Sequence, residues 1–197
     1  MKNLILSILM TLSTILSAQD ATDRYADITE TPSEYTIGTY ASRMVDGLGV
    51  RFYWATEGLS EENVAYRNSE ETRSIEETID HIVGLTTILK NAVNKRSTSF
   101  PIDIAGLDFN LKRSMILENI EEASVILEKS TAADFDTYEM IFARPDGNDT
   151  IYPFWNLING PIEDAIWHTG QVVMMRRLAG NPFDGNVSVL QGTYRKN

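Results

Sequence analysis

Apolar residues recur at steps of three and four over long parts of this chain, and this repeat constrains the fold more than any other feature. Such spacing places side chains on one face of an amphipathic α-helix. The three clearest runs are Ile37, Tyr40, Ala41, Met44, Val45, Leu48, Phe52 and Ala55; Ile75, Ile79, Ile82, Leu85, Leu89 and Val93; and Leu111, Met115, Ile116, Ile120, Ala123, Ile126 and Leu127. We therefore expect helices that bury these faces against one another.

Local sequence signals mark the start of the second helix and both ends of a fourth helix. Ser74 with Glu77 three residues later forms the pattern of a capping box at a helix start. Pro161 favours a first helical turn, and Gly180 favours the end of the helix that runs to about residue 178.

A segment with a strand-like rather than a helical pattern separates the third helix from the last. Residues 144–147 read Arg-Pro-Asp-Gly, a turn sequence, between two short runs at 138–142 and 150–154 that suit strands. The sequence thus predicts an all-α chain, an up-down four-helix bundle with a short β-hairpin before the last helix.

The first residues have the layout of a secretory signal peptide. Lys2 precedes a run at 4–16 that holds only apolar residues, Ser and Thr, and small residues follow before the polar stretch that starts at Asp20. We expect residues 1–19 to be a signal peptide, 20–36 a flexible linker and 37–197 the bundle domain, exported to the periplasm or the exterior. The alternative is an uncleaved anchor, although the run is short for a membrane span.

Charge and the absence of cysteine exclude several functions. The chain has 28 acidic and 17 basic residues, a net charge of −11, which disfavours nucleic acid and anionic lipid as partners. Without cysteine there are no disulfides, thiol nucleophiles or thiolate metal sites. After signal cleavage we expect no membrane association, and the partner we expect is a small-molecule substrate or ligand.

The last helix carries the candidate chemistry. Asp164 and His168 are four residues apart, so their side chains lie one above the other. The only other histidine is His81, in the second helix, and two imidazoles with one carboxylate give a three-ligand metal site with open positions. The alternatives are a solvated Asp–His pair and a half-buried structural histidine.

The rest of the last helix bears on where this site lies. Apolar residues cover one side of it, and Trp167, Met174 and Leu178 form a second apolar strip. Two separated apolar faces predict a helix that is largely enclosed, with the Asp164 stripe facing an interior cavity. The apolar excess, Met174 included, also makes a homodimer through helix faces a reasonable expectation.

Two segments resemble the DinB-like family. They are residues 159–171, NGPIEDAIWHTGQ, continuing to Arg176, Arg177 and Gly180, and residues 74–85, SIEETIDHIVGL. The resemblance covers about residues 37–181, and the family reads His-x-x-x-His-x-Gly-Gln in its last helix. It implies a four-helix bundle with a three-histidine site for one divalent metal ion, usually zinc or nickel. Related branches include thiol S-transferases and a thiol-dependent isomerase.

Matched residue by residue, the resemblance assigns roles and shows one departure. His81 matches the first metal histidine and His168 the third, while Asp164 stands at the second. A carboxylate there still binds zinc and shifts the preference toward iron or manganese, or it marks a lost site. Gln171 matches the family glutamine, for which we expect a role behind a ligand or in the pocket, or alternatively a buried structural amide.

These observations favour a divalent-metal-dependent enzyme of hydrolase or thiol-transferase type, with no substrate or catalytic acid or base identified. Export favours hydrolysis, because low-molecular-weight thiols are mainly cytosolic. The alternatives are a non-catalytic metal- or small-molecule-binding stress protein of the cell envelope, and a structural bundle without metal.

Overall fold

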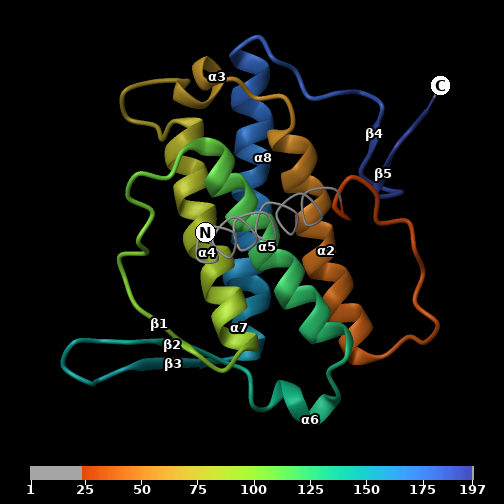
Figure 1. Cartoon of the computed structure of the whole chain (residues 1–197), viewed down its shortest axis with the longest axis vertical. Coiled ribbons are helices and arrows are strands. Elements are labelled where there is room, and N and C mark those ends of the chain that lie inside the picture. Colours follow the sequence, from red (N-terminus) through yellow and green to blue (C-terminus); the bar gives the residue numbers. More distant parts are fainter. Residues whose placement is uncertain (1–23, 197) are drawn as a thin grey trace, which may run out of the picture.

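The computed structural model describes residues 24–196 and is mostly helical, with a few short strands. Four long helices run along the longest axis of the molecule (Figure 1). They are α2 (Ile37–Thr56), α4 (Ile75–Val93), α5 (Phe109–Glu128) and α8 (Glu163–Leu178). Helix α2 packs against α5 and α8, and α4 packs against the same two helices, so each long helix has two long neighbours.

The predicted boundary signals are present. Ser74 Oγ accepts a hydrogen bond from Glu77 N at 3.1 Å, and Glu77 Oε2 accepts one from Ser74 N at 2.8 Å, which completes the capping box of α4. Gly180 follows α8 with φ of +80°, the left-handed conformation that commonly ends helices. Local side-chain chemistry thus fixes where these helices begin and end.

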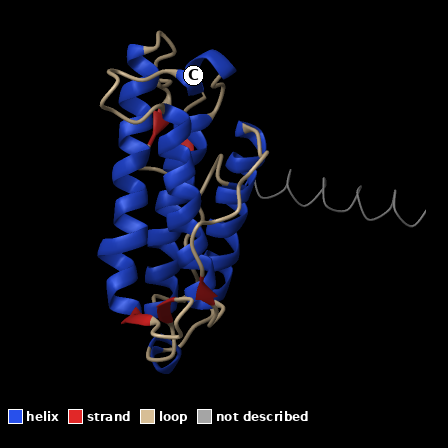
Figure 2. Cartoon of the chain, turned by 90° about the vertical axis from the view of Figure 1, so that its left-hand side faces the viewer, coloured by secondary structure: helices blue, strands red, loops and turns tan. Residues whose placement is uncertain are grey.

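The predicted hairpin is also present, and it belongs to a small sheet near one end of the helices (Figure 2). Strand β2 (Glu139–Phe142) pairs antiparallel with β3 (Thr150–Pro153), with Ile141 opposite Ile151. A strand that was not predicted, β1 (Ser97–Thr98), pairs parallel with β2. Two residues are too few to show an alternating pattern, so no local signal predicts β1.

Several short elements complete the described chain. They are α3 (Glu61–Ala65), α6 (Ala132–Phe135), α7 (Phe154–Leu157), the π-helical turn η1 (Ile158–Ile162) and the strand pair β4 (Val187–Ser188) and β5 (Thr193–Tyr194). Elements α7 and η1 lead directly into α8, and Gly160 with ψ of −112° breaks the helical path just before Pro161. The helix start predicted at Pro161 is therefore two residues early.

The first half of α2 presents a different face from the predicted one. Ile37 and Tyr40 are exposed, whereas Gly38 and Ser42 are buried. The reason is a close approach to the end of α5: a Cβ on Gly38 would lie 2.5 Å from the backbone oxygen of Ser130. Only small residues fit that contact, so small rather than bulky side chains mark the inner face here.

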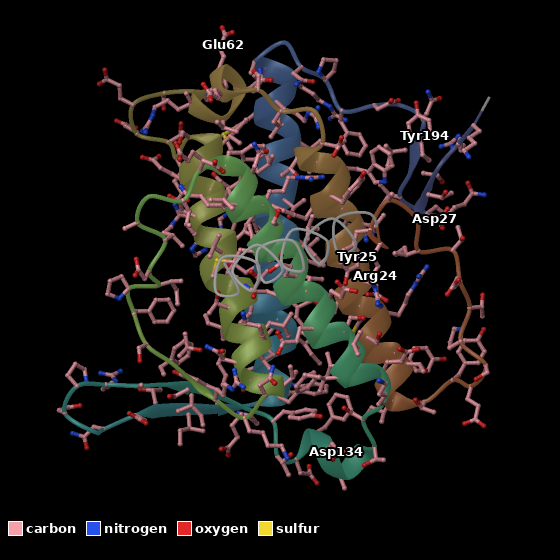
Figure 3. The ribbon with its side chains drawn as sticks, in the orientation of Figure 1. Arg24, Tyr25, Asp27, Glu62, Asp134 and Tyr194 are labelled. Carbon is pink, nitrogen blue, oxygen red and sulfur yellow. The ribbon has the colours of Figure 1, made fainter. Side chains whose placement is uncertain are left out.

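The segment predicted to be a flexible linker is packed against the helices over part of its length. Tyr25 is fully buried, and its hydroxyl donates to Asp46 Oδ1 at 3.2 Å. Its ring lies so close to α2 that a Cβ on Gly49 would be 2.4 Å from Tyr25 Cδ1. Figure 3 labels Tyr25, Asp27 and Tyr194 on this side of the molecule. A flexible linker that makes no contact with the helices would not be buried in this way.

Two further expectations concern the ends of the chain. The predicted signal peptide, residues 1–19, lies outside the described residues. Within the described part, no helix combines the length and the apolar character that crossing a bilayer requires.

Candidate metal centre

The three predicted ligands come together where α4 and α8 lie side by side. His81 sits in the middle of α4, and Asp164 and His168 occupy the first two turns of α8. One nitrogen from each imidazole and one carboxylate oxygen lie within 4.8 Å of one another. In the part of the chain that the structure describes, this is the group of His, Asp and Glu side chains placed to share an ion.

Donor distances test whether a metal ion fits. His81 Nε2 lies 3.4 Å from Asp164 Oδ2, and His168 Nε2 lies 3.4 Å from Asp164 Oδ1. A tetrahedral ion with bonds of about 2.0–2.1 Å keeps its ligand atoms about 3.3–3.4 Å apart. The two imidazole rings meet edge to face with centroids 4.5 Å apart. The two 3.4 Å distances go to different oxygens of the carboxylate, and one nitrogen from each ring with a single oxygen lies within 4.8 Å, so this donor set could hold a divalent metal ion.

Gln171 supports His168 from behind. Its Oε1 lies 2.9 Å from His168 Nδ1. An amide oxygen only accepts, so this contact keeps the proton on Nδ1 and leaves the Nε2 lone pair free toward Asp164. Gln171 is exposed, which does not fit the alternative of a buried structural amide. Hydrogen bonds of this kind fix the tautomer and orientation of metal-binding histidines.

The surroundings favour a neutral His81. Partial burial lowers its pKa from the ordinary value, the neighbouring His168 and Arg73 lower it further, and Asp164 opposes the shift. A neutral imidazole has a lone pair to donate, so a lowered pKa extends metal binding toward acidic pH.

The neighbouring carboxylate, Asp80, belongs to a different interaction. Lys112 of α5 is buried, and its Nζ lies 2.7 Å from Asp80 Oδ1 and 3.0 Å from Glu76 Oε1. The distance between Lys112 Nζ and Asp80 Oδ1 is short enough for an ion pair, but Asp80 Oδ1 has no partner in hydrogen-bond geometry. The sequence interpretation missed this buried lysine; the signal that could have shown it is the four-residue spacing of Glu76 and Asp80 on α4.

The site is more open than the sequence predicted. The side chains of His81, Asp164 and His168 are 34, 42 and 13% exposed. The second apolar strip of α8 is not enclosed either, since Trp167 and Met174 are 73 and 58% exposed. The prediction of an enclosed last helix is therefore wrong: α8 packs on α2 and α4, and its side that carries Trp167 and Met174 is exposed.

Comparisons with known protein families, with curated protein sequences and with solved structures found no match for this chain. The geometry of the residues therefore carries the functional argument.

Proposed function

We propose that this protein binds one divalent metal ion through His81, Asp164 and His168. The observation that carries the proposal is the placement of both imidazole Nε2 atoms 3.4 Å from the Asp164 carboxylate, across two helices. His81 and Asp164 are 83 residues apart in sequence, so no local constraint brings them together. The ring of contacts among the four long helices supports an up-down four-helix bundle of the DinB-like type as the scaffold.

The ligand types narrow the identity of the ion. Imidazole suits zinc, nickel, copper and iron, while a carboxylate favours harder ions such as manganese. We propose zinc or nickel as the preferred ion and iron or manganese as competitors that Asp164 admits. Substituting a carboxylate for a third imidazole also lowers the charge of the loaded site by one unit, which favours binding of a cation.

The function we propose is that of a metal-dependent enzyme, of hydrolase or thiol-transferase type, acting on a small molecule. A divalent ion with an open position supplies Lewis acidity, which polarises a substrate oxygen and lowers the pKa of water to about 7. The chain contributes the orientation: Gln171 holds the proton on His168 Nδ1, and partial burial lowers the pKa of His81, which favours its neutral form. The exposed side of Asp164 leaves the site accessible to a ligand. We also propose export, which favours hydrolysis over thiol transfer.

One observation favours a second candidate, a non-catalytic metal- or small-molecule-binding stress protein of the cell envelope. All three members of the His81 cluster are needed as ligands, and no further His, Asp or Glu in residues 24–196 joins that cluster as an acid or base. Turnover separates the candidates. Hydrolysis of generic esters or amides, or thiol transfer, that a chelator abolishes would establish the enzyme.

The experiment that tests the metal site is elemental analysis of the purified protein. The informative variants are Asp164→Ala and the double variant His81→Ala, His168→Ala. Glu163→Ala is the matched control, because it removes the adjacent carboxylate, which is not part of the cluster. We expect about one equivalent of metal in wild type and in the control, and its loss in both site variants. No metal after loading with each ion, with an unchanged melting temperature, would refute the proposal.

A further inference from the structure

A hollow lies on the other side of α8 from the metal-site residues, between α2, α8 and the segment that follows α8. Its volume is about 340 Å³, near the lower end of the range for small-molecule pockets. The wall is mostly apolar and comes from Val50, Ile166, Val173, Phe183, Val187 and Val189. Ile166 and Val173 are about 140–180° around α8 from Asp164 and His168, so this pocket is separate from the metal centre.

Two arginines, Arg51 and Arg177, also line the pocket, together with Thr169 and Gly170, and no described acidic residue does. Arg51 donates to the backbone oxygen of Gly47 at 2.6 Å, and neither guanidinium has a carboxylate within ion-pair distance among residues 24–196. No carboxylate of the described chain therefore competes with an anion for Arg51 and Arg177. Guanidinium is weakly hydrated and matches the planar carboxylate, so this pairing is complementary to an organic anion.

Arg51 is in addition poorly solvated. Burial lowers the pKa of its guanidinium, and the like charge of Arg43 lowers it further. An anion in the pocket would offset both effects by placing a negative charge next to a half-buried cation.

Gly170 is exposed and lines the pocket on the α8 side. A Cβ built at Gly170 meets no atom within 4 Å, and the residue lies inside a regular helix. Glycine destabilises a helix relative to alanine, and neither backbone conformation nor packing requires it at this position. Gly38 and Gly49 differ, because a side chain at either would collide with neighbouring atoms. A larger side chain at Gly170 would extend into space that no other part of the described chain occupies.

We propose that this pocket binds a small amphiphilic carboxylate, with its apolar body against the valines and Phe183 and its carboxylate held by Arg51 and Arg177. The wall supplies hydrophobic contact, and the arginines supply orientation and charge. The inference goes beyond the proposed metal chemistry and does not depend on it, since no residue is shared between the two sites.

The test is calorimetric titration of the purified full chain with octanoate, with octanol and octylamine as uncharged and cationic counterparts. We expect one octanoate per chain and weaker binding of both counterparts. Arg177→Gln should weaken octanoate about tenfold, since a charge-assisted hydrogen bond contributes about 1.5 kcal/mol or more. Arg96→Gln is the matched control, an exposed arginine outside the pocket, and should bind like wild type.

Substitution at Gly170 separates binding from folding. Gly170→Leu should abolish octanoate binding by filling the hollow, while Gly170→Ala should raise the melting temperature and still reduce affinity. Absence of octanoate binding, equal binding of octanol and octylamine, or equal effects of Arg177→Gln and Arg96→Gln would each overturn the proposal. If metal binding is lost while octanoate binding persists, the proposal of a carboxylate pocket holds. The two proposals can therefore fail independently.

Discussion

The interaction most open to a quantitative test is the cap that Arg176 of α8 places on the end of α2. Arg176 is 4% exposed. Its Nη1 donates to Trp54 O and Ala55 O, both at 3.0 Å, and its Nη2 donates to Glu57 O at 3.0 Å and Asn181 Oδ1 at 2.9 Å. Nε donates to Asn181 O at 2.9 Å. The last carbonyls of a helix lack partners within it, so this one side chain satisfies groups that would otherwise be unpaired.

The variant Arg176→Met keeps most of the apolar volume and removes all five hydrogen bonds. Bonds to a charged group contribute about 1.5–3 kcal/mol each when isolated, but these share one side chain and their effects do not add. Water can also reach some carbonyls after the change. We therefore expect a loss of about 3–5 kcal/mol in the free energy of unfolding, close to the cost of breaking a buried charge network. At about 2–4 °C per kcal/mol for a chain of this size, the melting temperature should fall by about 6–20 °C.

Urea denaturation followed by circular dichroism measures this loss, with Arg177→Met as the control. Arg177 is the adjacent arginine on α8 but is exposed, so its replacement should change stability by less than about 0.5 kcal/mol. A loss below about 1 kcal/mol in Arg176→Met, or equal losses in both variants, would refute the capping argument.

Three other outcomes follow from contacts described above. Gly49→Ala places a Cβ within 2.4 Å of the Tyr25 ring, so urea denaturation should show a loss of about 1–3 kcal/mol in the free energy of unfolding. An unchanged denaturation midpoint would contradict the packing of Tyr25 against Gly49. Gln171→Ala removes the support of His168, and chelator competition should show metal affinity reduced about 10–100-fold rather than abolished. The folded-state pKa of His81 is lowered, so the unfolded chain binds more protons than the folded chain between that pKa and about 6.5. The free energy of unfolding of the metal-free protein should therefore rise with pH through this window. The variant His81→Gln should flatten this rise. Unfolding free energies of both proteins at about pH 5 and about pH 7.5 check this last expectation, and equal slopes would contradict it.

Much of the scaffold could be predicted because its signals are local. Helical spacing, the Ser74 capping box and the turn before β3 each act within a few residues, and the structure confirms all three. The convergence of His81 with Asp164 and His168 could also be anticipated, because the chain has only two histidines and one lies four residues from a carboxylate.

The failures have a common physical cause, which is that packing between distant segments decides the outcome. The close approach of α2 to α5 at Gly38 reverses which residues face inward, and no pattern within α2 reports the position of α5. Burial of Tyr25 likewise depends on Gly49, 24 positions away, having no side chain. Exposure of Trp167 follows from how the helices assemble, because no other element within residues 24–196 covers that side of α8.

The packing of the segment around Tyr25 has a topological consequence. Ile28 N donates to Gly192 O at 2.8 Å, and Asp27 Oδ2 accepts from Thr193 Oγ1 at 2.5 Å, so the two ends of the described chain lie against each other beside α2. Trp54 stacks on Tyr194 in the same place, with ring centroids 5.3 Å apart. Proteins whose ends meet in this way tolerate circular permutation. A short peptide joining these ends, with a new opening in the exposed turn at residues 144–149, would change the order in which the helices leave the ribosome while leaving every helix in its place.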